Sequence, residues 1–151
     1  MEERQLLISQ RLLRYVVEHC LEEKPYEACG ILTGRGNRIL TAWATENARR
    51  STTAFEVEPS HQVQALNGAR KRGESLLAIY HSHPTAVAYP STSDIRMGIH
   101  WPEAARVILS LSGRVTQRAF YIRGNAVREI AFEVDEDVRG EWLDLRQSSR
   151  T

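Results

Sequence analysis

Residues 76–84 read Leu-Leu-Ala-Ile-Tyr-His-Ser-His-Pro, a run of apolar side chains that ends on two histidines and a proline. A continuous apolar run of this length is typical of a β-strand that is buried on both faces of a sheet. Pro84 has no backbone N–H and a fixed φ, so the strand is predicted to end just before it. The two histidines are therefore expected at the end of a buried strand.

Two amphipathic helices are predicted earlier in the chain. Apolar side chains recur at helical spacing across residues 10–23, where Ser9 is the expected N-cap and Pro25 ends the pattern. Pro59 opens a second helix, and Gly73 lies past its end. The first of these helices is expected to pack one face on the core.

The rest of the chain reads as strands joined by short turns. Strands are predicted at 29–33, 39–45, 105–111, 116–122 and 127–132, with a short one at Phe55–Val57, a polar loop at Glu46–Thr53 and a short helix near 92–99. The sum is an α/β fold with a central mixed sheet, two main helices and a short helix at the site. This domain is expected to cover residues 1–134, and the polar residues 135–151 to form a surface helix or a tail.

Composition excludes several classes of protein. The 151 residues include 20 Lys and Arg against 19 Asp and Glu, a net charge of +1, which argues against a nucleic-acid binder. No apolar run approaches the roughly 20 residues that span a bilayer, and the charged start, Met-Glu-Glu-Arg-Gln, does not resemble a signal peptide. Two cysteines are too few for a disulfide scaffold. A cytoplasmic protein, monomeric or weakly dimeric, is expected.

His81 and His83 are the first candidates for a metal site. Side chains alternate along a strand, so residues two apart point to the same side and two imidazoles can share one ion. Asp94, in the first turn of the short helix, is a candidate oxygen ligand, and zinc is well matched to such a set. Three protein ligands leave one tetrahedral position for water, which is the mark of a catalytic zinc site.

Two further residues fit the chemistry that such a site needs. Glu27, where the first helix gives way to a strand, is the candidate proton acceptor and donor. The hydroxyl of Ser91 is a candidate donor to the oxyanion that develops on a scissile carbonyl.

These residues together resemble the signature of the JAMM (MPN+) metalloprotease family. The pattern is an upstream Glu, then His-Ser-His, seven residues beginning with Pro, and Ser-x-x-Asp, which Glu27, His81–His83, Ser91 and Asp94 match at full spacing. The resemblance spans roughly residues 6–132 and is closest to the small stand-alone prokaryotic members. It implies a cytidine-deaminase-like fold, zinc on His81, His83 and Asp94, Glu27 as general acid and base, and Ser91 at the oxyanion.

The resemblance also implies a reaction and a partner. The reaction would be hydrolysis of a peptide or isopeptide bond by a metal-activated water, after the C-terminal Gly-Gly of a ubiquitin-like or β-grasp sulfur-carrier protein. The flexible tail of that partner would lie extended beside an exposed strand edge. Trp101 is expected to pack rather than to bind, although its place after the site helix would also let it border a substrate groove. From its place in the family pattern, the loop Glu46–Thr53 would contact the partner.

Plainer alternatives stand beside this interpretation. Ser91 and Asp94 also fit a helix capping box, and capping is compatible with metal binding by Asp94. Cys29 is better explained as a small buried hydrophobe than as a reactive thiol. The whole protein could also be a non-catalytic scaffold of the same fold.

Overall fold

The computed structural model describes residues 5–148 as an α/β fold with one mixed eight-stranded sheet. Residues 1–4, on which the signal-peptide expectation rests, and the last three residues of the expected tail lie outside the described residues. The strands are β1 (Gln5–Ser9), β2 (Cys29–Arg35), β3 (Arg38–Thr45), β4 (Ser75–His83), β5 (Ala105–Ser110), β6 (Thr116–Arg123), β7 (Ala126–Asp135) and β8 (Glu141–Asp144). The helices are α1 (Gln10–Glu23), α2 (Pro59–Lys71), α3 (Thr92–Met97), a 3-10 turn η1 (Gly98–His100) and α4 (Leu145–Ser148). None of the helices in this range is both long and apolar enough to cross a bilayer.

The sheet closes on itself in a barrel-like way, which the sequence did not predict. Its strand order is β1-β7-β6-β5-β4-β2-β3-β8, and β1 pairs in parallel both with β7 and, at Leu7 and Arg38, with β3. The backbone N–H of Leu7 also donates to the carbonyl of Asn37 at 2.9 Å. The five-residue strand β1 therefore joins two parts of the sheet that are far apart in its order.

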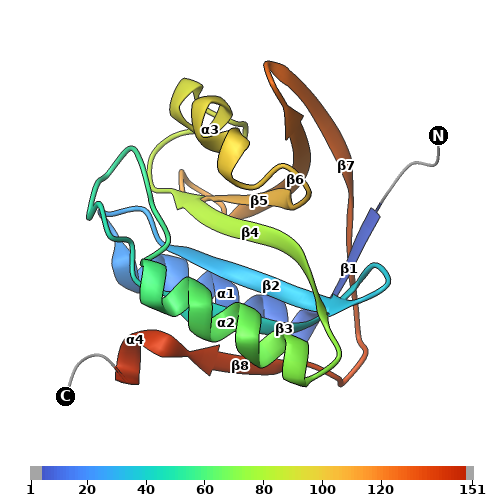
Figure 1. Ribbon diagram of the computed structural model, residues 1–151. Helices are drawn as coiled ribbons and strands as arrows, with labels where there is room; N and C mark the ends of the chain where they lie inside the picture. Colours follow the sequence, from blue (N-terminus) through green and yellow to red (C-terminus); the bar gives the residue numbers. More distant parts are fainter. Residues whose placement is uncertain (1–4, 149–151) are drawn as a thin grey trace.

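The two main helices cover opposite faces of the central strands, as Figure 1 shows for β2 and β4. Ala78 and Tyr80 of β4 pack in one core cluster with α1, whereas Ile79 packs in the other with α2. This alternation is the period-two pattern of a strand buried on both faces, as predicted. Helix α2 comes so close to the sheet that a Cβ at Gly68 would lie 2.4 Å from the Trp43 ring.

Two predictions for short segments are corrected by the structure. Phe55–Val57 is not a strand, because only Val57 makes an isolated bridge, to Asn47, although Phe55 and Val57 are buried and Glu56 is exposed as the alternation requires. Residues 141–144 are not a surface helix or a tail, because β8 pairs in parallel with β3. Leu143 packs against the core cluster of α2, and these apolar contacts explain why a mostly polar segment joins the sheet.

Candidate metal centre

The end of β4 and the start of α3 bring three predicted ligands together. His81 and His83 lie on the α2 side of β4, two and four residues beyond Ile79, and β4 ends at His83, just before Pro84. The Nε2 atoms of His81 and His83 lie 3.2 Å apart, and each lies 3.1 Å from Oδ2 of Asp94. All three side chains are buried.

This arrangement fits a metal ion in both geometry and chemistry. Two ligand atoms that are each about 2.0–2.1 Å from one ion lie about 3.3 Å apart at the tetrahedral angle, close to the observed separations. Lone pairs on three atoms at this distance repel one another unless a cation or a proton lies between them. The convergence predicted from the sequence is therefore present, and imidazole with carboxylate is a donor set that suits a zinc-like ion.

Local contacts orient the two imidazoles. Nδ1 of His83 lies 2.7 Å from the carbonyl oxygen of Val87, so it must carry a proton and donate, and in the neutral imidazole this leaves the lone pair on Nε2 facing the cluster. The His81 ring is stacked on Phe55, with ring centroids 4.4 Å apart and planes 21° apart. Phe55 therefore limits the rotation of the His81 ring.

Asp94 serves as a cap and as a member of the cluster at once. Ser91 Oγ accepts a hydrogen bond from the Asp94 N–H at 3.1 Å, and the Ser91 N–H donates to Asp94 Oδ2 at 2.9 Å. The two alternatives weighed from the sequence therefore coexist, since the same carboxylate oxygen faces both imidazoles. The Ser91 hydroxyl oxygen is used as an acceptor, which leaves its hydrogen to donate elsewhere.

Charge and burial shift the pKa values of these groups in different directions. Burial alone would raise the pKa of Asp94, but the nearby imidazoles outweigh it and hold that pKa well below its usual range. Burial lowers the pKa of His81. Burial opposes the charged form of His83 as well, but hydrogen bonds to Asp94 and to the Val87 carbonyl raise its pKa.

Glu27 lies beside this cluster, between α1 and β2. It is 4% exposed, and its Oε1 is buried without a hydrogen-bond partner in the described part of the chain. Burial raises the pKa of its carboxyl to about 8, and the charges of His83 and Asp94 act on it in opposite directions. A carboxyl that titrates near neutral pH is suited to accept and return a proton.

Asn47, to which the sequence assigns no role, and Ser82 of the His-Ser-His motif hold the Glu27 segment in place. The side-chain nitrogen of Asn47 donates to the carbonyl oxygen of Glu27 at 3.0 Å, and Ser82 Oγ accepts from the N–H of the next residue, Ala28, at 2.8 Å. The Glu27 N–H also donates to the carbonyl of Ser51 at 2.8 Å. In the sequence Asn47 is one polar residue in a polar loop, so no local signal distinguishes it.

Cys29 belongs to the core. It is fully buried, and burial raises the pKa of its thiol to about 12, which is the opposite of what a reactive thiolate needs. The preferred interpretation from the sequence, a small buried hydrophobe, agrees with this environment.

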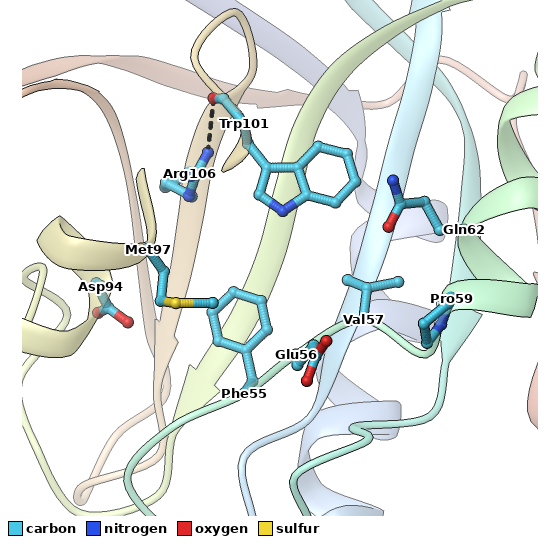
Figure 2. A pocket seen from close by; sticks show the side chains of 9 residues that line it. All are labelled: Phe55, Glu56, Val57, Pro59, Gln62, Asp94, Met97, Trp101 and Arg106. Carbon is cyan, nitrogen blue, oxygen red and sulfur yellow. Dashed lines mark hydrogen bonds between the residues drawn. The ribbon is translucent and has the colours of Figure 1, made fainter. Parts of the chain in front are cut away.

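A pocket of about 460 Å³, counting its open mouth, adjoins the cluster (Figure 2). Its wall is formed by side chains from α2, α3, β5 and the segments before α2 and β5: Phe55, Glu56, Val57, Pro59, Gln62, Asp94, Met97, Trp101 and Arg106. Trp101 packs against the core cluster of α2, the interpretation that the sequence favours, and it also borders the pocket. The loop Glu46–Thr53 contributes none of these side chains, whereas the residues that follow it do.

Comparisons with known proteins agree with this geometry. The chain is 31% identical over 135 residues to the CysO-cysteine peptidase of Mycobacterium tuberculosis, covering 87% of this chain and 92% of that protein. It is 30% identical to the desampylase of Haloferax volcanii, covering 82% and 89%. The solution structure of a Desulfitobacterium hafniense protein superposes with a TM-score of 0.80 at 28% identity, covering 87% and 94%.

The family assignment rests on the greater part of the chain. A profile described as prokaryotic homologs of the JAB domain matches residues 9–123. This range contains Glu27 and all three members of the His-His-Asp cluster. The chain therefore belongs to the prokaryotic JAB-domain family, among the small stand-alone proteins of the JAMM/MPN type.

Proposed function

We propose that this protein is a zinc-dependent peptidase or isopeptidase that cleaves after the C-terminal Gly-Gly of a ubiquitin-like or β-grasp sulfur-carrier protein. The observation that carries the proposal is the convergence of His81, His83 and Asp94 beside a buried, high-pKa Glu27. Relatives named as a peptidase and a desampylase support the reaction class, as does a Thermus thermophilus relative named as a probable TtuB-protein conjugate cleaving protease, 37% identical over 60% of this chain.

The position of each residue indicates the role that it would have in catalysis. His81, His83 and Asp94 would hold the ion, and zinc there would act as a Lewis acid and lower the pKa of a water molecule. Glu27 would accept a proton at its unpartnered oxygen and deliver it to the leaving amine. The free hydroxyl hydrogen of Ser91 would donate to the developing oxyanion while its oxygen stays bonded to the α3 backbone.

The test separates proton transfer from metal binding. Glu27→Gln keeps the shape of the side chain but cannot shuttle a proton, so we expect turnover of a Gly-Gly carrier conjugate to fall about a hundredfold or more. Zinc content, measured on the purified protein, should stay near the wild-type value. Glu18→Gln, an exposed change on α1 with the same loss of charge, is the matched control.

The outcomes decide the proposal. Unchanged turnover in Glu27→Gln would remove Glu27 from the mechanism. A wild-type protein that holds zinc but cleaves no Gly-Gly carrier conjugate would overturn the proposed function itself.

A further inference from the structure

Arg106 is a buried cation in the wall of the pocket beside the cluster (Figure 2). It lies in β5, opposite Ile79 of β4, and is 2% exposed. Its Nη1 donates to the carbonyl oxygens of Trp101 and Ala104, both at 3.2 Å. Its Nη2 is buried and has no hydrogen-bond partner within residues 5–148. One corner of a buried guanidinium in the pocket wall therefore lacks an acceptor.

The unpartnered N–H groups of Nη2 are energetically unfavourable until they gain an acceptor. A buried donor without a partner is destabilising, and more so when it is charged. Burial lowers the pKa of Arg106 to about 10, so the group is still protonated at neutral pH. Asp94 is the acid whose charge acts on Arg106, and that carboxylate already faces the two imidazoles. An acceptor oxygen from a ligand would satisfy Nη2, and a carboxylate would also balance its charge.

The position of the pocket indicates which part of a substrate enters it. The leaving amine must lie close to the proton donor, Glu27, and Glu27 does not line the pocket, whereas Asp94 does. A pocket whose wall includes a member of the cluster but not the proton donor is the one expected to receive the acyl part of the substrate. An extended tail advances about 3.3 Å per residue, and the two glycines have no side chains. The first side chain of the tail that can enter the pocket is therefore the one before Gly-Gly.

We propose that this pocket receives the side chain that precedes the Gly-Gly pair of the carrier tail, and that Arg106 selects a carboxylate there and disfavours lysine or arginine. The inference rests on the proposed function and narrows its substrate class. Glu56 also borders the pocket, but it is exposed, so its charge is screened by water and salt.

The experiment varies one residue of the tail. Three variants of one β-grasp carrier, ending in Glu-Gly-Gly, Gln-Gly-Gly or Lys-Gly-Gly, are compared as substrates. Each is joined through its last glycine to an alanine leaving group. We expect kcat/KM to fall in that order, with about a tenfold or larger difference between the Glu and Lys tails. Affinities of the same carriers for Glu27→Gln, which binds without turnover, should follow the same order.

Variants at Arg106 separate recognition from support of the fold. In Arg106→Gln the Glu-to-Lys ratio should collapse toward one, whereas Arg106→Lys, which keeps the charge, should preserve the order. Arg96→Gln, an exposed change of equal charge on α3, should leave the ratio unchanged. A purely structural role for Arg106 would lower all three substrates by the same factor and keep the ratio.

Failure of the inference differs from failure of the proposed function. Equal cleavage of the three tails by the wild type, or a ratio that survives Arg106→Gln, would overturn the inference. So would a preference, abolished by Arg106→Gln, for an alanine leaving group over alaninamide, because it would place the carboxylate on the other side of the bond. If none of the three tails is cleaved, the proposed function itself is overturned.

Discussion

Strand β4 buries a polar cluster that contains histidine on each of its faces, and the two clusters differ in how their polar atoms are arranged. On the α1 side, the Tyr80 hydroxyl lies 2.6 Å from Nδ1 of His19, a pair in which one atom can donate and the other accept. On the α2 side, Nε2 of His81, Nε2 of His83 and Oδ2 of Asp94 converge to within 3.2 Å of one another. The histidines on both faces are buried, so burial alone does not distinguish a site from a core contact.

Packing reinforces the difference between the two clusters. The ring of Tyr80 is pressed against the backbone of β2, where a Cβ at Gly30 would lie 2.2 Å from it, so no ligand fits there. The His81–His83–Asp94 cluster instead adjoins an open pocket. A polar cluster is thus a candidate site when its acceptors converge and solvent reaches it, and a core contact when donor and acceptor match.

Asp94→Asn gives the largest expected effect, because it breaks the convergence while keeping the cap. The amide oxygen still accepts from the Ser91 N–H, so α3 should keep its start, but the charge that balances the ion is lost. We expect bound zinc, measured by elemental analysis, to fall to a small fraction of the wild-type value and turnover to fall more than about a hundredfold. Full metal occupancy in this variant would return Asp94 to capping alone.

The pH dependence of stability gives the next largest effect and isolates Glu27. Its pKa is 4.5 when the carboxyl is free and about 8 in the fold, so the metal-free folded protein binds an extra proton between these values. Below pH 4.5 the carboxyl is protonated in the folded and the unfolded protein alike. Between pH 4.5 and about 8 the unfolded protein loses this proton first, so the free energy of unfolding falls as the pH rises.

Glu27→Gln cannot titrate, so the comparison with wild type isolates this group. After chelation of the metal, the variant should gain on wild type by roughly 2–5 kcal/mol in free energy of unfolding between pH 4.5 and 8. Urea unfolding across this pH range measures the difference. A constant difference between the two proteins would contradict a buried, high-pKa Glu27.

Local patterns predicted the parts of the fold that local chemistry determines. The helix over Gln10–Glu23 was predicted to the residue, and the N-cap of Ser9 is confirmed by a 3.0 Å hydrogen bond from the Leu12 N–H. The His-x-His spacing at the end of β4 was enough to predict the convergence, because a strand places alternate residues on one face.

The remainder depends on partners that lie far away in the chain. β1 forms because residues 5–9 pair with residues 131–135, and β8 forms because residues 141–144 pair with residues 41–44. Neither short segment carries a distinctive pattern of its own, since pairing and burial decide β-structure more than propensity does. The hydrogen bond from Asn47 to Glu27 and the unpartnered nitrogen of Arg106 cannot be predicted from the sequence for the same reason.

Tyr80→Phe gives the smallest expected effect and tests the other side of the comparison. The change removes the hydroxyl that faces His19 Nδ1 and leaves the ring that packs on Gly30 in place. We expect a loss of about 1–2 kcal/mol in free energy of unfolding, because a buried polar atom loses its partner. Zinc content and kcat/KM should match the wild type, since Tyr80 points away from His81 and His83. A fall in metal content would show that the two faces of β4 are coupled, and the distinction between matched and converging clusters would then fail for this strand.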